Sequence, residues 1–413
     1  MRKSLNIGSH IGNYTILKPI GTGAFSSVWL CEEAGMKKNV AIKIVENNNQ
    51  SYMAKLKGEI NILKQINHPF IVEFYDWIEF PHYFVIVMEY VSQGNLQQYI
   101  HKKGALSDIL AKKIFIQIAL ALDYLHNVLK IAHRDIKPEN ILIDEYENIR
   151  VIDFGLSQVF TDENPFLQSN CGSPAYASPE LVKGQIATKA SDIWSLGVIL
   201  YNMVVGNLPF VDSKINGLMN KIVYEDVKIP NSIPSSLSSF ILKLLNKNPM
   251  ERPFIEDVIQ HNFIQKSEEY GMIKHGLRRL ADIHQYDSEI KSEMVKIGIC
   301  PIIIDDLEFD KSSELHIIYL IMRREKLKAE MKELFYIEAP PCPSNCMNKK
   351  DNKVTFHGIE AEQVQKNTDS KHLNVPMMIN ISSRRKSKPV IPHKNLLEIS
   401  EKSIKSFEFQ ISK

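Results

Sequence analysis

The N-terminal part of the chain carries short apolar runs separated by turn residues, a pattern typical of β-strands. A helical pattern interrupts these runs, with Ile62, Leu63 and Ile66 on its apolar side. The pattern predicts short strands at these runs and a helix between them. The apolar runs lie at residues 14–20, 28–31, 40–43 and 84–87.

Apolar stripes with helical spacing return beyond residue 264. Three of them follow one another: Ile290, Met294 and Ile297; residues 302–309; and Leu315, Ile318, Tyr319 and Met322. The first stripe stops at Gly298, and glycine is a common helix stop. The stripes predict a small three-helix module at residues 286–336.

The last part of the chain has a different composition. From residue 349 onward it is rich in Lys, Asn and Ser, so we predict that residues 341–413 are mostly disordered. A basic cluster at residues 384–388 is interpreted as part of a solvated tail. A nuclear-import signal or a patch that binds acidic lipid is the alternative.

Composition narrows the class of protein. With 413 residues and 44% hydrophobic content, the chain can bury a large core and should hold more than one domain. Its formal net charge of +2 gives no bulk attraction to nucleic acid, and its five scattered cysteines favour a reducing compartment. No apolar run approaches the roughly 20 residues that span a bilayer. We therefore expect no integral membrane contact, and a location in the cytoplasm or the nucleus.

Acidic and amide side chains occur at a spacing that suits phosphoryl transfer. Asn140 follows Asp135 by five positions, and Asp153 follows Asn140 by thirteen. The first carboxylate can act as a base beside a substrate hydroxyl, while the amide and the second carboxylate can supply oxygen ligands to magnesium. The spacing predicts a phosphotransfer site in which Asn140 and Asp153 hold the metal.

A glycine-containing turn and a lysine lie upstream in the expected order. Gly21 and Gly23 allow backbone N–H groups to approach phosphates, whereas Ser26 stands at the third glycine position of the usual pattern. Lys43 ends the next predicted strand, where its ammonium could hold nucleotide phosphates. Glu59 lies in the helical pattern and could reach Lys43.

With these motifs in order, the chain resembles the eukaryotic protein kinase family over residues 14–264. The resemblance implies an α+β, two-lobed fold, with a small β-rich lobe at residues 14–88 and a larger helical lobe at residues 92–264. It implies ATP and Mg²⁺ as cofactors and proteins as substrates. A lysine two positions after the catalytic aspartate is the pattern of serine/threonine kinases.

The resemblance also supplies roles for individual residues. Asp135 would orient or deprotonate the substrate hydroxyl, Lys137 would neutralise the moving phosphoryl group, and Asn140 would complete the catalytic set. The residues expected to bind ATP are Ile20, Gly21, Gly23, Val28, Ala41, Lys43, Glu59, Glu89, Val91, Leu142 and Asp153.

Two further features of the larger lobe concern its architecture. Glu180 would be buried opposite Arg252, because a guanidinium fork suits a carboxylate. Asp192 would brace the catalytic loop.

Substrate preference is expected to depart from that of many related kinases. The resemblance implies a hinge at residues 88–91, whose backbone would pair with adenine. In many relatives a glutamate just past this hinge binds a basic residue three positions before the phosphoacceptor, and here that position is Asn95. A lost charge-assisted partner typically contributes about 1.5 to 3 kcal/mol. We predict a weak preference for arginine there, with Glu139 still favouring a basic residue nearby.

The segment after Asp153 resembles the calcium/calmodulin-kinase group and, within it, the relatives of the AMP-activated kinase. In those relatives the activating phosphosite is a threonine, and the matching residue here is Ser169. Arg134 supplies a cation suited to a loop phosphate. We predict activation by phosphorylation of Ser169 by an upstream kinase. The alternative is that Ser169 is an ordinary exposed serine.

The region after the catalytic domain has two interpretations. The predicted module at residues 286–336 resembles the ubiquitin-associated-like module of AMP-activated kinase relatives. The second interpretation is a calmodulin-binding autoinhibitory helix at residues 274–283, but this stretch is short and is followed by acidic residues, so we do not expect calmodulin as a partner. A scaffold with the kinase fold and little catalytic power is the rival to the enzyme as a whole.

Overall fold

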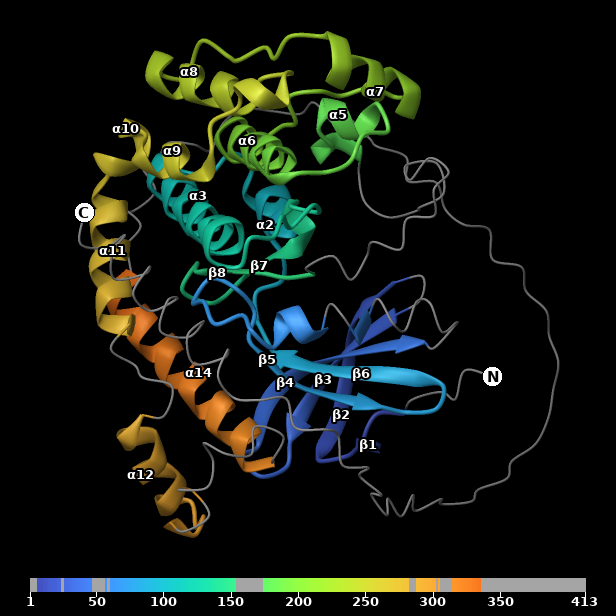
Figure 1. Cartoon of the computed structure of the whole chain (residues 1–413), viewed down its shortest axis with the longest axis vertical. Coiled ribbons are helices and arrows are strands. Elements are labelled where there is room, and N and C mark those ends of the chain that lie inside the picture. The colour runs from blue at the N-terminus through green and yellow to red at the C-terminus, as the bar shows by residue number, and fades with distance from the viewer. Residues whose placement is uncertain are drawn as a thin grey trace, which may run out of the picture. The chain divides into compact units, whose positions relative to one another are not determined.

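The computed structural model describes residues 6–23, 26–46, 56–57, 60–153, 174–281, 287–301, 304 and 314–335. All of these residues belong to one compact unit (Figure 1). Among the described helices, none combines the length and the apolar character needed to cross a membrane.

The first part of the chain forms a six-stranded antiparallel sheet in the order β1-β2-β3-β4-β6-β5. Successive residues of β6 point to opposite faces, so Val85 and Val87 join one buried cluster while Phe84 and Ile86 join another. Both faces of the sheet are therefore covered. The strands are β1 (His10–Ile11), β2 (Tyr14–Thr22), β3 (Ser26–Glu33), β4 (Lys38–Glu46), β5 (Phe74–Glu79) and β6 (Tyr83–Glu89).

The second part is mainly helical and surrounds a large buried core that includes Phe115, Trp194 and Phe240. The segment that is expected to be catalytic, residues 133–140 (the catalytic segment), leads directly into a two-stranded hairpin of β7 (Ile141–Ile143) and β8 (Ile149–Val151). Single helical turns lie at Tyr124–Val128, Pro138–Asn140, Pro174–Tyr176 and Pro249–Glu251. The helices are α2 (Leu96–Lys103), α3 (Asp108–Asp123), α5 (Pro179–Val182), α6 (Lys189–Val205), α7 (Ile215–Tyr224), α8 (Ser235–Leu244), α9 (Ile255–Gln260), α10 (Asn262–Gln265) and α11 (Glu268–Ala281).

Local signals account for several helix boundaries in this lobe. Asn95 opens α2 with a capping box, in which its side chain accepts from the N–H of Gln98 and the Gln98 side chain accepts from the N–H of Asn95. The side chain of Ser107 caps α3. Gly206 ends α6 with φ of 81°, in the left-handed region that glycine adopts without strain.

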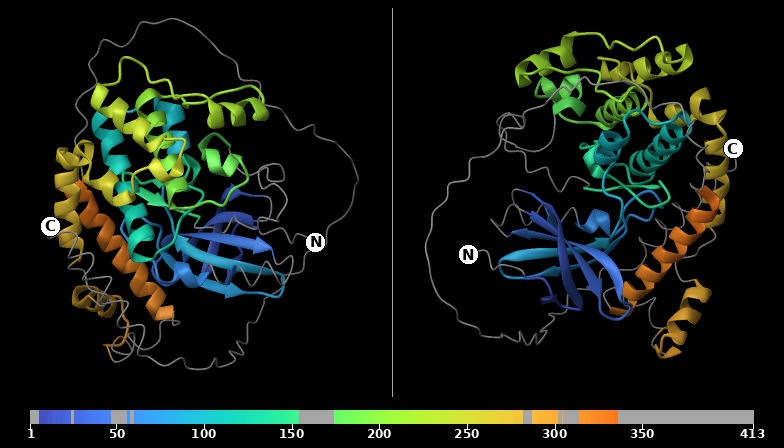
Figure 2. Two further views of the ribbon diagram at one scale, coloured as in Figure 1. Left: turned by 45° about the horizontal axis from the view of Figure 1, so that its top comes forward. Right: turned by 180° about the vertical axis from the view of Figure 1, so that it is seen from behind.

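Two helices follow α11, namely α12 (Ser288–Lys296) and α14 (Glu314–Phe335). They enclose a small apolar cluster of their own, built from Ile290, Met294, Ile304, Tyr319 and Met322. The N–H of Asp287 donates to the Tyr319 hydroxyl over 2.6 Å and ties the start of α12 to α14. In all views α14 lies beside α11 and the sheet (Figures 1 and 2).

The predicted two-lobed kinase fold is confirmed, and each predicted apolar run falls inside a strand. One detail of the sequence pattern is wrong. Ile297 was expected on the buried face of its helix, but α12 ends at Lys296 and leaves Ile297 53% exposed, whereas Ile290 is 1% exposed. The tail at residues 341–413 and most of residues 302–309 lie outside the described residues.

The stretch considered for calmodulin binding begins inside α11. Ile273 and Leu277 of this helix are buried in the core of the helical lobe. These two apolar side chains therefore pack within the chain.

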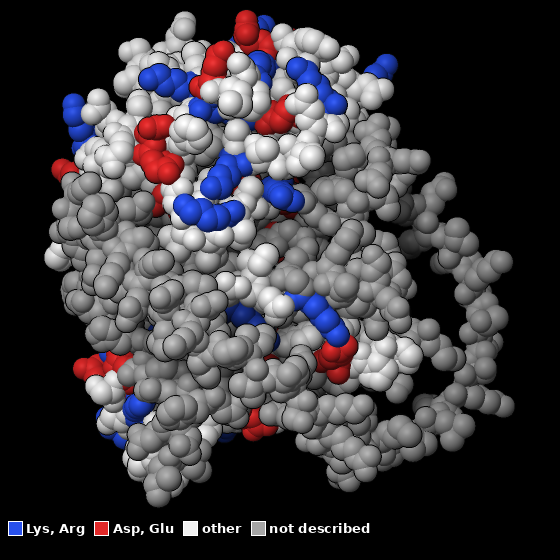
Figure 3. All heavy atoms as spheres, viewed as in Figure 1, with Lys and Arg blue, Asp and Glu red and all other residues white. Residues whose placement is uncertain are grey.

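Charge on the described surface is mixed. On the face shown in Figure 3, Lys and Arg alternate with Asp and Glu over the described residues at the top. This distribution agrees with the small formal net charge of +2.

Candidate active site

The catalytic segment lies between the turn after α3 and strand β7. Lys137 donates through Nζ to both carboxylate oxygens of Asp135, at 2.9 and 2.8 Å. Asn140 donates through Nδ2 to Oδ2 of Asp135 at 2.8 Å and to its main-chain oxygen at 2.9 Å. Two donors on the same segment therefore hold the Asp135 carboxylate in one orientation.

A buried carboxylate from α6 supports this segment. Asp192 accepts hydrogen bonds from the backbone N–H groups of His133 at 2.8 Å and Arg134 at 2.7 Å, and it contacts Nε2 of His126 at 2.8 Å. Arg134 has φ of 70°, a conformation that costs a non-glycine residue energy. The bonds to Asp192 offset this cost, so the predicted bracing role of Asp192 has a geometric basis.

His133 links the catalytic segment to the strand that precedes Asp153. Its Nε2 donates to the carbonyl of Ile152 at 3.0 Å, and its Nδ1 accepts from the N–H of Asp135 at 3.3 Å. Burial lowers the pKa of His133, which favours the neutral ring that these two bonds require.

Lys43 and Asp153 form an ion pair between segments 110 residues apart. Burial alone would raise the pKa of Asp153, but the Lys43 ammonium outweighs it and holds this pKa below its usual range. Asp153 has φ of 60°, which is again the left-handed region. The pair places a cation beside a carboxylate at the junction of the two lobes.

The expected nucleotide face of the sheet is built by strand register. Val28 on β3 lies opposite Lys43 on β4, and Gly21 on β2 lies opposite Val28. Ala41 stands two residues before Lys43, so both project from the same face. Ile20 is 42% exposed at the edge of this face, and Gly23 donates its N–H to the carbonyl of Ser26 at 2.7 Å. A Cβ on Gly23 would lie 3.1 Å from the Ser26 hydroxyl, so a larger residue here would require the Ser26 side chain to shift.

Glu89 differs from the other expected ATP contacts. It lies opposite Val40, one register position away from Ala41, so its side chain projects from the opposite face of the sheet. That side chain is buried among cations and does not face the expected nucleotide site. The expected contact with adenine would therefore involve the backbone of Glu89 and Val91, not the Glu89 side chain. Leu142, on β7, is the residue of the helical lobe that is expected to contact the adenine ring.

The donor set fits a magnesium ion. Asn140 turns its amide nitrogen towards Asp135, which leaves its amide oxygen as a ligand, and Asp153 offers carboxylate oxygens. Hard divalent cations take oxygen ligands of this kind. Asp153 would exchange part of its contact with Lys43 for the metal.

The expected pair between Glu180 and Arg252 is present and buried. Two guanidinium nitrogens of Arg252 donate to the two carboxylate oxygens of Glu180, each at 2.7 Å, and Ser191 donates to the same carboxylate at 2.9 Å. Burial would raise the pKa of Glu180, but its bonds with Arg252 lower it. The bidentate pair fastens α5 to the segment after α8.

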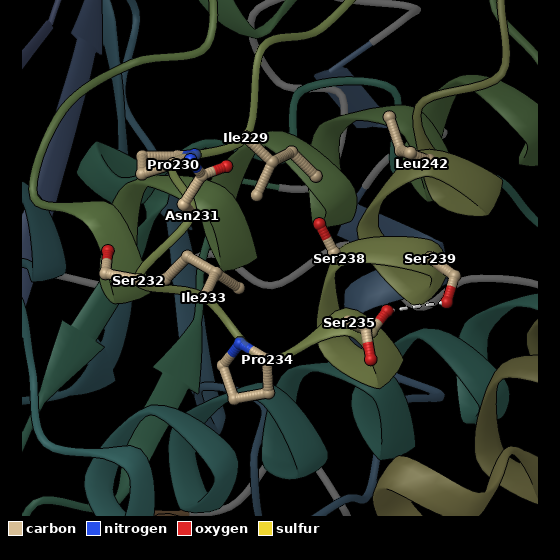
Figure 4. A pocket seen from close by; sticks show the side chains of 10 residues that line it. All are labelled: Ile229, Pro230, Asn231, Ser232, Ile233, Pro234, Ser235, Ser238, Ser239 and Leu242. Atoms are coloured by element: carbon tan, nitrogen blue, oxygen red, sulfur yellow. Dashed lines mark hydrogen bonds between the residues drawn. The ribbon is translucent and has the colours of Figure 1, made fainter.

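Two predicted functional residues, Glu59 and Ser169, lie outside the described residues. A surface hollow lined by α8 and by the loop that leads into it contains none of the predicted site residues (Figure 4). The side chains around it are uncharged, so the hollow lacks the acid, base or cation that phosphate chemistry requires. They belong to Ile229, Pro230, Asn231, Ser232, Ile233, Pro234, Ser235, Ser238, Ser239 and Leu242.

No role was assigned from sequence to Arg324 and Lys328, yet both contact the hinge from α14. The sequence feature that indicates their burial is their spacing along the helix. Ile317, Ile321, Arg324, Lys328 and Met331 follow one another at intervals of three or four residues and share one face of the helix. Two cations within an otherwise apolar stripe indicate buried acidic partners.

Comparison with known proteins places the chain in a family. A family model described as protein kinase domain matches residues 14–264, more than half of the chain. Sucrose non-fermenting protein kinase 1 of Fusarium virguliforme is 38% identical over 62% of this chain and 37% of its own length.

Two further relatives agree. Carbon catabolite-derepressing protein kinase of Saccharomyces cerevisiae is 37% identical over 64% of this chain and 42% of its own length. SNF1-related protein kinase catalytic subunit alpha KIN12 of Arabidopsis thaliana is 37% identical over 70% of this chain and 59% of its own length. The chain thus spans 37 to 59% of the length of these relatives. It belongs to the protein kinase family and is related to the SNF1-type kinases.

Proposed function

We propose that this protein transfers the γ-phosphate of ATP to serine or threonine hydroxyls of proteins. The observation that carries the proposal is the Asp135 carboxylate, held by Lys137 and Asn140 within 2.8 to 2.9 Å. A carboxylate fixed in this way can accept the proton of a hydroxyl that it orients. The kinship with named SNF1-type kinases supports the same reaction.

The proposed role of each site residue follows from the chemistry of its side chain. Asp135 would receive the hydroxyl proton, while the ammonium groups of Lys43 and Lys137 would stabilise negative charge on the phosphates. Asn140 and Asp153 would hold Mg²⁺, which supplies charge neutralisation to the ATP phosphates when bound. Val28, Ala41 and Leu142 would enclose the adenine ring. We further infer action in the cytoplasm or the nucleus.

The basic test is transfer of labelled phosphate from ATP to a serine-containing protein, with a tyrosine-containing copolymer as a parallel acceptor. We expect label on the serine protein, dependent on added Mg²⁺, and none on tyrosine. Absence of transfer by the full chain, including after treatment with an activating kinase, would argue for a scaffold.

Substrate preference should show little selection for arginine three positions before the phosphoacceptor. Asn95 is neutral, and its side chain is already engaged as the cap of α2. Glu139 is proposed still to favour a basic residue nearby, since one of its carboxylate oxygens accepts no hydrogen bond from the residues that the structure describes. A peptide library measures both preferences.

A matched pair of variants sharpens this test. Asn95→Asp keeps the helix cap and adds a carboxylate, so selection for arginine at that position should increase several-fold. Ser107→Asp adds the same charge at the cap of α3 and should leave the profile unchanged. Strong arginine selection by the parent enzyme would contradict the proposed role of Asn95.

Activation is proposed to require phosphorylation of Ser169. A phosphate there adds a charge of about −2 and could order the segment near Arg134. After treatment with an activating kinase, the parent should gain activity several-fold, whereas Ser169→Ala should gain none. Thr161→Ala, in the same segment, serves as the control. Equal activation of parent and Ser169→Ala would exclude this site.

A further inference from the structure

Helix α14 contacts both lobes of the kinase domain. Ile317 and Ile321, in its first half, pack in the apolar cluster on the face of the sheet that carries Val85 and Val87. In its second half, Met331 is buried in the core of the helical lobe and Leu327 packs against that core. The helix therefore runs along the hinge, residues 88–91, which joins the two lobes.

Arg324 lies midway along this helix and is 1% exposed. Its guanidinium donates to Oε2 of Glu89 at 2.7 Å, to the carbonyl of Ile71 at 2.7 Å and to the carbonyl of Pro69 at 3.1 Å. One side chain thus joins the hinge to the segment that leads into β5. The fork of an arginine can bond several acceptors at fixed angles, which a lysine cannot do.

The surrounding charges form one buried network. Arg150, on β8, donates to the second carboxylate oxygen of Glu89 at 3.1 Å, and Lys328 lies 3.4 Å from the same oxygen. Arg323 bonds Glu73 at 2.5 Å. Burial alone would raise the pKa of Glu89, but Arg324, Arg150 and Lys328 lower it well below its usual range. Glu89 is therefore a buried anion whose position depends on one cation from the helical lobe and two from α14.

The hinge backbone is placed by this network. The Glu89 side chain lies on the face of the sheet that packs against α14. The bond between its carboxylate and Arg324 therefore connects α14 to the backbone of residues 89–91. The N–H of Glu89 also donates to the carbonyl of Glu73, whose side chain bonds Arg323. A shift of the Glu89 carboxylate would move the backbone atoms that face the adenine site.

We propose that Arg324, outside the catalytic domain, is a positioning residue for nucleotide binding, because it holds the adenine-binding hinge through Glu89. The inference rests on the proposed function, since it assigns the hinge to adenine. Arg324 itself touches neither nucleotide nor substrate. Its loss should weaken ATP binding selectively and leave the protein-substrate site little changed.

The decisive variant is Arg324→Met in the full chain, because methionine retains the apolar packing and removes the guanidinium. We expect the KM for ATP and the dissociation constant of a fluorescent ADP analogue to rise about tenfold, with the KM for peptide unchanged. Arg324→Lys keeps the charge but loses the bonds to the carbonyls, so an intermediate increase is expected. This conservative variant tests the proposal even if the methionine variant folds poorly.

Lys326→Met is the matched control. Lys326 lies on the same helix, but it bonds Asp287 and Glu289 at 2.7 Å, away from the hinge. Nucleotide binding should match the parent in this variant. The proposal is overturned if folded Arg324→Met and Arg324→Lys bind the ADP analogue as the parent does. It is also overturned if Arg324→Met raises kcat with KM for ATP unchanged, since α14 would then act as a brake.

The analogue measurement separates this inference from the proposed function. If the parent transfers no phosphate, the proposed function fails, whatever the variants do. If the parent transfers phosphate but nucleotide binding does not depend on Arg324, only the positioning role fails.

Discussion

Replacing Asp135 with asparagine should lower kcat by about 10²- to 10⁴-fold, the usual contribution of general acid–base catalysis. The variant should fold and bind ATP, because asparagine has nearly the same size and keeps one oxygen for the donors Lys137 and Asn140. The lost group is the carboxylate that accepts the hydroxyl proton. Steady-state kinetics at saturating ATP, together with a thermal melt, measure both expectations.

A control at Asp144 tests whether Asp135 is the residue that acts as the base. Asp144 is a buried carboxylate elsewhere in the same lobe, 3.5 Å from Arg150. Its replacement by asparagine should affect stability more than the chemical step. Transfer that survives Asp135→Asn at the parental rate would remove Asp135 from the mechanism.

Replacing Lys43 with methionine should lower kcat/KM by about 10²- to 10³-fold, which is typical for the loss of one group that stabilises transition-state charge. Methionine retains an unbranched apolar chain similar to the methylene stem of lysine but removes the ammonium that contacts Asp153. The variant should position the ATP phosphates less accurately, and it should also fix the metal-binding carboxylate of Asp153 less firmly. The reaction is followed by labelled phosphate transfer over a range of ATP concentrations.

Lys38→Met supplies the comparison on the same strand. Lys38 begins β4 and forms an exposed ion pair with Glu325 at 3.3 Å, and such pairs contribute about 0 to 1 kcal/mol. This variant should retain parental activity. If Lys43→Met behaves like Lys38→Met, the ammonium of Lys43 does not take part in transfer.

The local parts of the site could be read from sequence because their chemistry depends on short spacings. Asp135, Lys137 and Asn140 lie within six residues, so one loop brings their side chains together. The strands that carry Val28 and Ala41 could also be predicted from sequence, because alternating and continuous apolar runs reflect the burial of side chains on a sheet. Kinship with a known family then supplied the roles.

The contacts between distant segments depended on tertiary structure. Lys43 pairs with Asp153 across 110 positions, and Arg324 reaches Glu89 across 235. No local period relates such residues, because their distance is set by the packing of whole elements. The same holds for Ile297, which continues an apolar stripe but lies beyond the end of its helix.

The sequence by itself determined the family, the two-lobed fold and the catalytic loop, because each depends on residue types at short, ordered spacings. Tertiary structure decided which way the hinge glutamate points and what surrounds it. In the sequence, Glu89 resembles an ordinary hinge residue, and the position of Arg324 within an apolar stripe does not identify its partner. Only the packing of α14 across both lobes buries the two charges together, and burial makes their pairing essential.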